Sequence, residues 1–240
     1  PVTAKNCDVR GAWDKANMER QRAKIVKAIN NLGADVVSLE EIENSAKAAS
    51  SVPASFKGER RDYALATLVD ALNEQAGEGT WAYVPSPQTV PDLDVEDVIR
   101  TAFIYKPTKV ATVGATRILT DSDAFNGKNG YEHGRQPDAQ AFKAKGAADS
   151  DAFLVVANHF KSKGSASNAL NQDPGDGSGN ADYTRQAQAD ALLAFTDEVK
   201  SDLKLEKVFL VGDFNAYYAE KPIQKIVAAG YTDLSEQVSE

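Results

Sequence analysis

The segment that most constrains the fold of this chain is an apolar run, Val208–Val211, that ends abruptly in Gly-Asp-Phe-Asn-Ala. The run predicts a buried strand that ends at Gly212. Asp213 and Asn215 follow at the carboxyl end of that strand, where open α/β sheets place their ligands. Because they are two positions apart, an extended backbone would point both side chains to the same side. We therefore expect a polar site at the end of a buried strand.

Two other apolar runs end in polar residues of related kinds. The second half of residues 34–44 contains three glutamates. The second half of residues 154–164 contains a histidine followed by lysine and serine side chains. A carboxylate can bind a hard cation, and a histidine can transfer a proton. Together with the Asp/Asn pair, these groups predict the hydrolysis of phosphate esters.

Helical and extended patterns alternate along the rest of the chain. Helices are predicted at about 14–32, 61–76, 182–199 and 222–230. Strands are predicted at 81–84, 98–105, 110–113, 151–159 and around Phe142. In the first helix, Ile25, Ile29 and Leu32 are expected to share the buried face. This order predicts an α/β fold with two packed mixed β-sheets flanked by helices, a four-layer α/β/β/α sandwich.

Length and charge narrow the class of protein. A single domain over residues 1–240 is long enough to bury a complete core. The net charge of -8 argues against a large basic face for DNA. It does not exclude a nuclease, because a bound cation changes the local field and a few lysines can steer phosphates. The chain has no apolar run that would span a membrane and begins without a signal-peptide pattern.

The chain resembles the endonuclease/exonuclease/phosphatase superfamily, which has the deoxyribonuclease-I-like fold. The matching blocks occur in the family's order: Arg20–Val26 with Ala34–Asn44, Phe103–Pro107, Arg135–Pro137 with Ala139–Phe142, Asn158–Gly164, Gly212–Ala216 and Gly230–Leu234. Within the superfamily, the chain is most similar to the secreted bacterial nuclease branch. The resemblance implies a divalent-metal-dependent phosphodiesterase with Mg²⁺ as the cofactor, or Mn²⁺ or Ca²⁺ in its place. Its implied substrate is DNA, cut internally, or RNA, and its implied location is secreted or cell-surface. No obligate protein partner is evident.

The resemblance also implies a role for several residues. Glu41 matches the family's metal ligand, and the alternative is that Glu41 belongs to a solvated strand end. Glu40 and Glu43 would lie on the other face of a regular strand. The implied catalytic residues are His159, as a phosphate contact or general acid, and Asp213 and Asn215, which activate water and orient the phosphate. The alternative for His159 is a purely structural histidine. The alternative for Asp213 and Asn215 is an Asx turn, which is compatible with catalysis.

Further residues are expected at the substrate phosphate: Arg135, Asn158, Lys161, Ser162 and Tyr105. A guanidinium matches the geometry of phosphate oxygens, although Arg135 is followed by Gln-Pro where the family has Pro-Pro. Tyr105 could equally be a core residue. The loop at 173–180 could bind Ca²⁺, but it lacks the EF-hand spacing, and a solvated loop is favoured.

Two segments that the resemblance predicts are not found in the sequence. The family opens with an Asn-containing strand and closes with a Ser-Asp-His strand, in which the Asp orients a second histidine. We therefore expect a domain truncated at both ends, without its terminal strands, that alone is inactive or nearly so. Two other functions stay open. One is the same reaction on lipid or inositol phosphates, and the other is a non-catalytic surface-binding domain.

Overall fold

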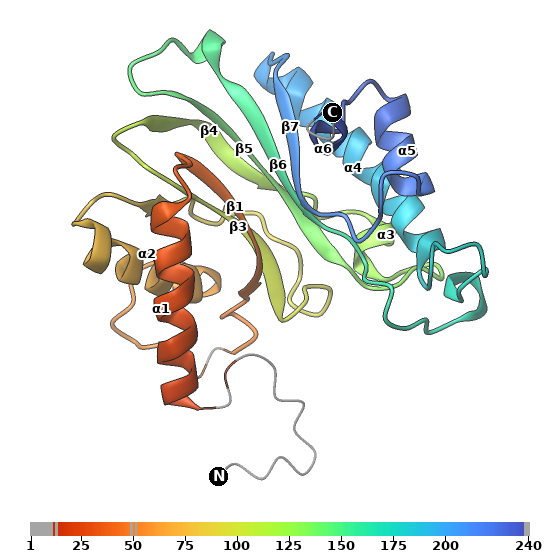
Figure 1. The fold of residues 1–240 in the computed structure, drawn as a ribbon, viewed down its shortest axis with the longest axis horizontal. Helices are drawn as coiled ribbons and strands as arrows, with labels where there is room; N and C mark the ends of the chain where they lie inside the picture. The colour runs from red at the N-terminus through yellow and green to blue at the C-terminus, as the bar shows by residue number, and fades with distance from the viewer. Residues whose placement is uncertain (1–11, 13, 49, 51, 238–240) are drawn as a thin grey trace.

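The computed structural model describes residues 12, 14–48, 50 and 52–237, with the backbone alone at 236–237. The ends of the expected 1–240 domain lie outside these residues. Two sheets form the centre (Figure 1). The first has the order β1-β3-β2 and is antiparallel, with β1 at Val36–Glu43, β2 at Ala82–Tyr83 and β3 at Ile99–Tyr105.

The second sheet has the order β4-β5-β6-β7 and is mixed. Its strands are β4 at Val110–Ile118, β5 at Arg135–Ala144, β6 at Phe153–His159 and β7 at Val208–Asp213. The first three pair antiparallel, whereas β6 and β7 are parallel. Because the carboxyl ends of parallel strands meet, the residues after β6 and β7 share one edge of the sheet. The strand expected at 110–113 continues to Ile118 through a break in register after Val113.

Helices cover the outer face of each sheet, as expected for a four-layer sandwich (Figure 1). Helices α1 (Lys15–Asn31) and α2 (Tyr63–Ala76) cover the first sheet, and α4 (Asp182–Leu203) and α5 (Lys221–Ala228) cover the second. The short helices α3 and α6 lie at Asp123–Asn126 and Leu234–Gln237. No helix of the described residues is long and apolar enough to cross a membrane.

The alternation of β6 shows how the layers pack. Leu154 and Val156 belong to the core cluster beneath α4, whereas Val155 and Ala157 belong to the cluster between the two sheets. Since neighbouring strand residues point to opposite faces, a strand buried on both sides needs a continuous apolar run. The apolar run at residues 153–157 of this strand is therefore explained by the sandwich.

The first helix differs from its predicted orientation. Asp14 caps it as expected, accepting the Asn17 backbone N–H at 2.7 Å. Its buried residues are Val26 and Ile29, while Ile25 and Leu32 are 48% and 61% exposed. The prediction that Ile25 and Leu32 share the buried face was wrong. The stripe that packs toward α2 runs through Val26 and Ile29, which puts Ile25 and Leu32 at its border.

Candidate active site

Glu41 lies in a β-bulge of β1. Leu39 pairs with Ala102 and Ile42 pairs with Arg100, so two glutamates on β1 face the single residue Thr101 on β3. Glu41 has a φ of 59°, a left-handed conformation that costs a side-chain-bearing residue about 1–2 kcal/mol. A bulge re-aims side chains and breaks the regular alternation of a strand. The expectation that both Glu40 and Glu43 lie opposite Glu41 was wrong: a regular strand would already put Glu43 on the face of Glu41, and the bulge removes the regular alternation at Glu40.

His159 and Asp213 lie opposite each other at the ends of β6 and β7. The distance between His159 Nε2 and Asp213 Oδ2 is 3.9 Å, longer than a hydrogen bond. The histidine side chain is 3% exposed and the aspartate side chain 55% exposed. His159 Nδ1 has no hydrogen-bond partner among the described residues. The pair thus places a buried imidazole beside an accessible carboxylate.

Asn215 orients the Asp213 carboxylate. Its backbone N–H donates to Asp213 Oδ1 at 2.8 Å, which makes the Asx turn considered from the sequence. Its side-chain amide donates to Asp213 Oδ2 at 3.2 Å and to the Phe160 carbonyl at 3.0 Å. One amide proton is therefore donated to Asp213 and the other to the residue that follows β6. In this arrangement Asn215 holds the aspartate, and any phosphate contact by its amide would replace one of these bonds.

Gly212 allows β6 and β7 to approach closely at the site. Its φ is 121°, and a Cβ atom built on it would lie 2.1 Å from the Asn158 carbonyl oxygen. That atom belongs to the backbone of β6 and cannot move aside as a flexible side chain could. The glycine before Asp213 is therefore required by the backbone geometry.

The electrostatics around His159 identify its charged neighbours. Burial and the Arg135 guanidinium lower the pKa of His159, and the opposing contributions of Asp213, Glu41 and Asp97 are smaller. Burial raises the pKa of Glu40, and the negative charge of Asp213 adds to that rise. The β1 bulge therefore lies within electrostatic reach of both His159 and Asp213. The structure brings together three of the expected residues, Glu41, His159 and Asp213, at one edge.

Arg135 belongs to the same edge. It pairs with His159 across β5 and β6, and its Nε atom lies 3.0 Å from Asp97 Oδ2. The interpretation of the sequence did not include Asp97. The only signal for it was a single carboxylate shortly before an apolar strand, and many solvated strand ends have one.

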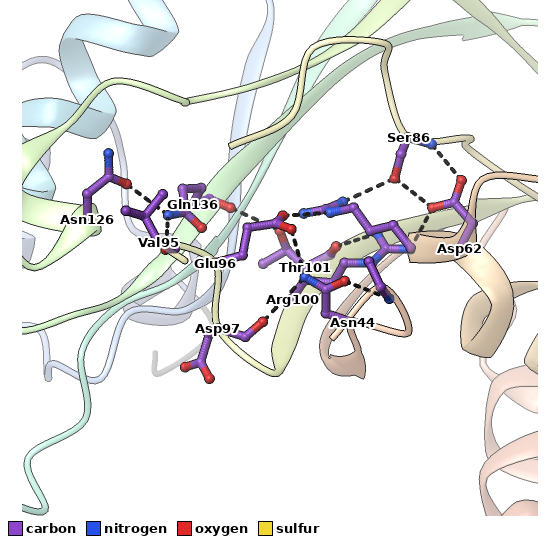
Figure 2. Close-up of polar contacts among 12 residues, drawn as sticks. Asn44, Asp62, Ser86, Val95, Glu96, Asp97, Arg100, Thr101, Asn126 and Gln136 are labelled. Atoms are coloured by element: carbon purple, nitrogen blue, oxygen red, sulfur yellow. Dashed lines mark hydrogen bonds and ion pairs between the residues drawn. The ribbon is translucent and has the colours of Figure 1, made fainter. Parts of the chain in front are cut away.

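Residues 95–97 connect the end of β1 to the start of β5 (Figure 2). The Asn44 amide donates to Glu96 Oε2 at 2.9 Å, and Arg61 Nε donates to Glu96 Oε1 at 2.7 Å. On the other side, the Gln136 amide donates to the Val95 carbonyl at 2.9 Å. This buried network fixes the strand that carries Glu41 relative to the strand that carries Arg135.

Two residues expected at the phosphate lie elsewhere. Asn158 is fully buried, and its amide donates to the Val156 and Val211 carbonyls at 2.8 and 3.1 Å. Tyr105 pairs with Val36 at the other end of β1, and its ring packs 5.9 Å from Phe142. The positions favour a structural role for Asn158 and the core alternative for Tyr105.

The two residues after β6 that were expected at the phosphate stay near the site. Lys161 Nζ lies 3.9 Å from Glu132 Oε2, and its backbone N–H donates to Gln188 Oε1 at 2.8 Å. Ser162 is half-buried in the turn that follows. The Lys161 charge is thus balanced by Glu132, which lies between α3 and β5 and was not among the expected site residues.

A buried arginine organises the 173–180 loop that was considered for Ca²⁺. The Arg185 guanidinium is fully buried and donates to the Ser178 and Asn180 carbonyls, both at 2.7 Å. It also donates to the Lys161 carbonyl at 3.2 Å. Carbonyl oxygens of the kind that would coordinate a calcium ion therefore accept from a guanidinium instead. The solvated-loop alternative fits this arrangement better.

The donor set at the site consists of carboxylates. Glu40, Glu41 and Asp213 are hard oxygen donors, and Mg²⁺ keeps several waters and needs only one or two carboxylates. Among the described residues, no group of three His, Cys, Asp or Glu side chains is arranged around one point. The residues present therefore fit an open, hydrated cation site centred on Glu41, and they do not fit a closed protein cage.

Comparison with known proteins relates this geometry to a family. The model of the Endonuclease/Exonuclease/phosphatase family matches residues 14–233. No curated protein matches the chain.

Several solved structures share the fold. The human Nocturnin catalytic domain with bound sulfate is 18% identical with a TM-score of 0.53, over 88% of this chain and 62% of that one. ANGEL2, a 2',3'-cyclic phosphatase in complex with adenosine-2',3'-vanadate, is 15% identical with a TM-score of 0.51, over 85% and 46%. The Bacteroides thetaiotaomicron mannosyl-6-phosphatase Bt3783 is 14% identical with a TM-score of 0.52, over 92% and 68%. The chain thus spans between about half and two thirds of these structures, and the likeness shows the fold.

Proposed function

This chain belongs to the Endonuclease/Exonuclease/phosphatase family, and we propose that it is the core of a divalent-metal-dependent phosphodiester hydrolase that cuts DNA internally, or RNA. The observation that carries the proposal is the meeting of Glu41, His159 and Asp213 at one edge. In the sequence, Glu41 lies more than a hundred positions before the other two residues. Glu41 is also held in a strained conformation, which proteins retain mainly at functional sites.

Each side chain has a distinct task in the proposed reaction. Glu41 would hold the cation, and Mg²⁺ bound there would stabilise negative charge on the phosphate and on the leaving oxygen, whose bond to phosphorus breaks as water attacks. Asp213 is accessible and oriented by Asn215, so it can take a proton from the water that attacks phosphorus in line.

His159 and Arg135 would act on the phosphate itself. Burial and the Arg135 guanidinium lower the pKa of His159 and so favour the neutral ring, which can donate its N–H to a phosphate oxygen. The Arg135 guanidinium suits a second phosphate oxygen. Both side chains come from neighbouring positions on β5 and β6, so one phosphate could contact both.

The substrate class is the finer part of the proposal. Solved structures of this fold include a 2',3'-cyclic phosphatase and a mannosyl-6-phosphatase, so the fold alone does not select a substrate. The resemblance of the Asn158–Gly164 block to secreted bacterial nucleases favours DNA and a secreted or cell-surface location. Lipid or inositol phosphates form the second candidate class.

The test compares Glu41→Gln with Glu43→Gln in the full-length protein. Both change one carboxylate on the exposed end of β1, but only Glu41 lies in the bulge. We expect Glu41→Gln to reduce Mg²⁺-dependent plasmid nicking by roughly 100-fold or more and Glu43→Gln to stay within about threefold. Unchanged nicking by Glu41→Gln would overturn the metal assignment. Faster turnover of sphingomyelin or an inositol phosphate than of DNA would favour the second class.

A further inference from the structure

Tyr217 is a highly exposed aromatic residue beside the candidate site. It follows Asn215 by two positions and keeps 79% of its surface exposed. Two residues span at most about 7 Å. A nucleic-acid strand advances about 3.4 Å per nucleotide, so Tyr217 lies within roughly two nucleotides of Asn215, whose amide contacts the Asp213 carboxylate.

The surroundings of Tyr217 hold it in place. Its backbone N–H donates to Glu220 Oε1 at 3.1 Å, and the same carboxylate forms an ion pair with Lys163. The Lys163 ammonium lies 4.8 Å from the centre of the Tyr217 ring, within the range of a cation–π contact. The Glu220 side chain is only 10% exposed, so a buried carboxylate anchors both partners.

A single exposed aromatic residue is ordinary on a protein surface and by itself needs no explanation. Tyr217 differs because the Glu220 carboxylate binds both its backbone N–H and the Lys163 ammonium that lies over its ring. Holding these groups in place before a ligand binds reduces the conformational entropy lost on binding. An exposed, preorganised ring beside a phosphate site suits a flat, unpaired nucleobase. The Lys163 ammonium over the ring disfavours a cationic choline headgroup, and a sugar or inositol ring has no π-face to stack on the tyrosine.

We propose that Tyr217 and Lys163 form a stacking platform for an unpaired base next to the scissile phosphate. The inference rests on the proposed function and adds to it a preference for nucleic acid with unstacked bases. Because Glu220 balances the Lys163 charge, the platform recognises the base by stacking and contributes little to the salt dependence of binding. An exposed basic patch would produce the opposite behaviour.

The experiment measures binding of the full-length protein in EDTA, so that cleavage does not interfere. The probes are a fluorescein-labelled single-stranded oligonucleotide and an abasic oligonucleotide of the same length, followed by fluorescence anisotropy. We expect Tyr217→Ala to raise Kd roughly 5- to 30-fold for the base-bearing strand and less than about twofold for the abasic strand. Tyr217→Phe and Tyr217→Trp should retain affinity. The matched control is Tyr218→Ala, which removes the adjacent tyrosine, 42% exposed.

Three results would overturn the platform. These are unchanged affinity in Tyr217→Ala, an equal loss for both strands, and an equal loss in Tyr218→Ala. Protection of Tyr217 from nitration by tetranitromethane in the full-length protein would also overturn it, because the ring would then be covered.

Cleavage assayed separately with Mg²⁺ distinguishes the two proposals. Metal-dependent cleavage that is insensitive to Tyr217 rejects the platform alone. Base-dependent binding through Tyr217 without any cleavage rejects the proposed hydrolase alone.

Discussion

The His159 Nε2 atom lies 3.9 Å from Asp213 Oδ2 because β6 and β7 run parallel and end side by side. This distance is too long for a hydrogen bond, and the carboxylate is oriented by Asn215 instead. The other ring nitrogen, Nδ1, has no hydrogen-bond partner among the described residues. A buried polar atom without a partner is costly, and such atoms are concentrated at functional sites. The relationship makes the protonation of His159 a sensitive report on the site.

The first prediction concerns the pKa of His159. Burial and Arg135 disfavour the charged ring, so the folded-state pKa lies below the ordinary value of 6.5. The histidine therefore lowers stability as the pH falls below 6.5, because the unfolded chain then binds a proton that the folded chain does not. The chain has two histidines, so His133→Gln leaves a single imidazole for NMR titration. We expect a midpoint below 6.5 in EDTA that rises in Arg135→Gln; a midpoint at or above 6.5 would contradict the electrostatic account.

The second prediction concerns the ion pair that holds Arg135. Asp97→Asn leaves the guanidinium without its 3.0 Å partner, so the arginine loses its fixed position. We expect KM for DNA to rise roughly 5- to 10-fold with kcat changed less than about threefold. Removing the Asp97 charge should also lower the pKa of His159 further. Asp94→Asn, an exposed neutralisation in the same segment, is the control, and an equal effect there would reject a positioning role for Asp97.

The third prediction compares two glycines with positive φ. In Gly212→Ala the new Cβ would meet the Asn158 carbonyl oxygen at 2.1 Å, whereas at Gly33 no atom lies within 4 Å of the Cβ position. Gly33→Ala should therefore lower the free energy of unfolding by only about 1–2 kcal/mol, from backbone strain. Gly212→Ala must also separate β6 from β7, and we expect a larger loss by urea denaturation. Equal losses would show that the close approach of the strands does not require the glycine.

The fourth prediction concerns Asp138, a carboxyl buried between the sheets. It borders a cavity of about 10 Å³ with Arg61 and Arg100, and its Oδ1 has no hydrogen-bond partner among the described residues. Burial raises its pKa to about 6. The folded-state pKa thus exceeds the unfolded value of 3.8, so its stabilising contribution is complete below pH 3.8 and is lost as the pH rises through 6.

Replacing Asp138 with Asn removes this cost of ionisation. We expect Asp138→Asn to raise the free energy of unfolding at pH 8 by roughly 1–3 kcal/mol and to give no gain near pH 4. Asp70→Asn, an exposed position on α2, should change stability by less than about 0.5 kcal/mol at both pH values. Destabilisation of Asp138→Asn at pH 8 would mean that the charge is needed by Arg61 and Arg100.

Local chemistry was enough to predict most of the elements. Asp14 caps α1 as expected, and the apolar run before Asp213 forms β7. In α4, Leu192, Phe195 and Val199 are buried on one side at helical spacing. Capping, periodicity and glycine conformation depend on residues close in sequence, so they can be identified without knowing the fold.

The sequence by itself thus determined most of the strands and helices, which strands end in polar groups, and, through its motifs, the family. Only the tertiary structure decided how the groups combine. The bulge at Glu41, the ion pair of Arg135 with Asp97 and the binding of loop carbonyls by Arg185 each depend on pairing between distant segments. The pairing of β1 with β3 also placed Tyr105 beside Val36, at the opposite end of β1 from Glu41. The physical reason is that strand register and buried ion pairs are set by long-range packing, in which a shift of one residue exchanges the two faces of a strand.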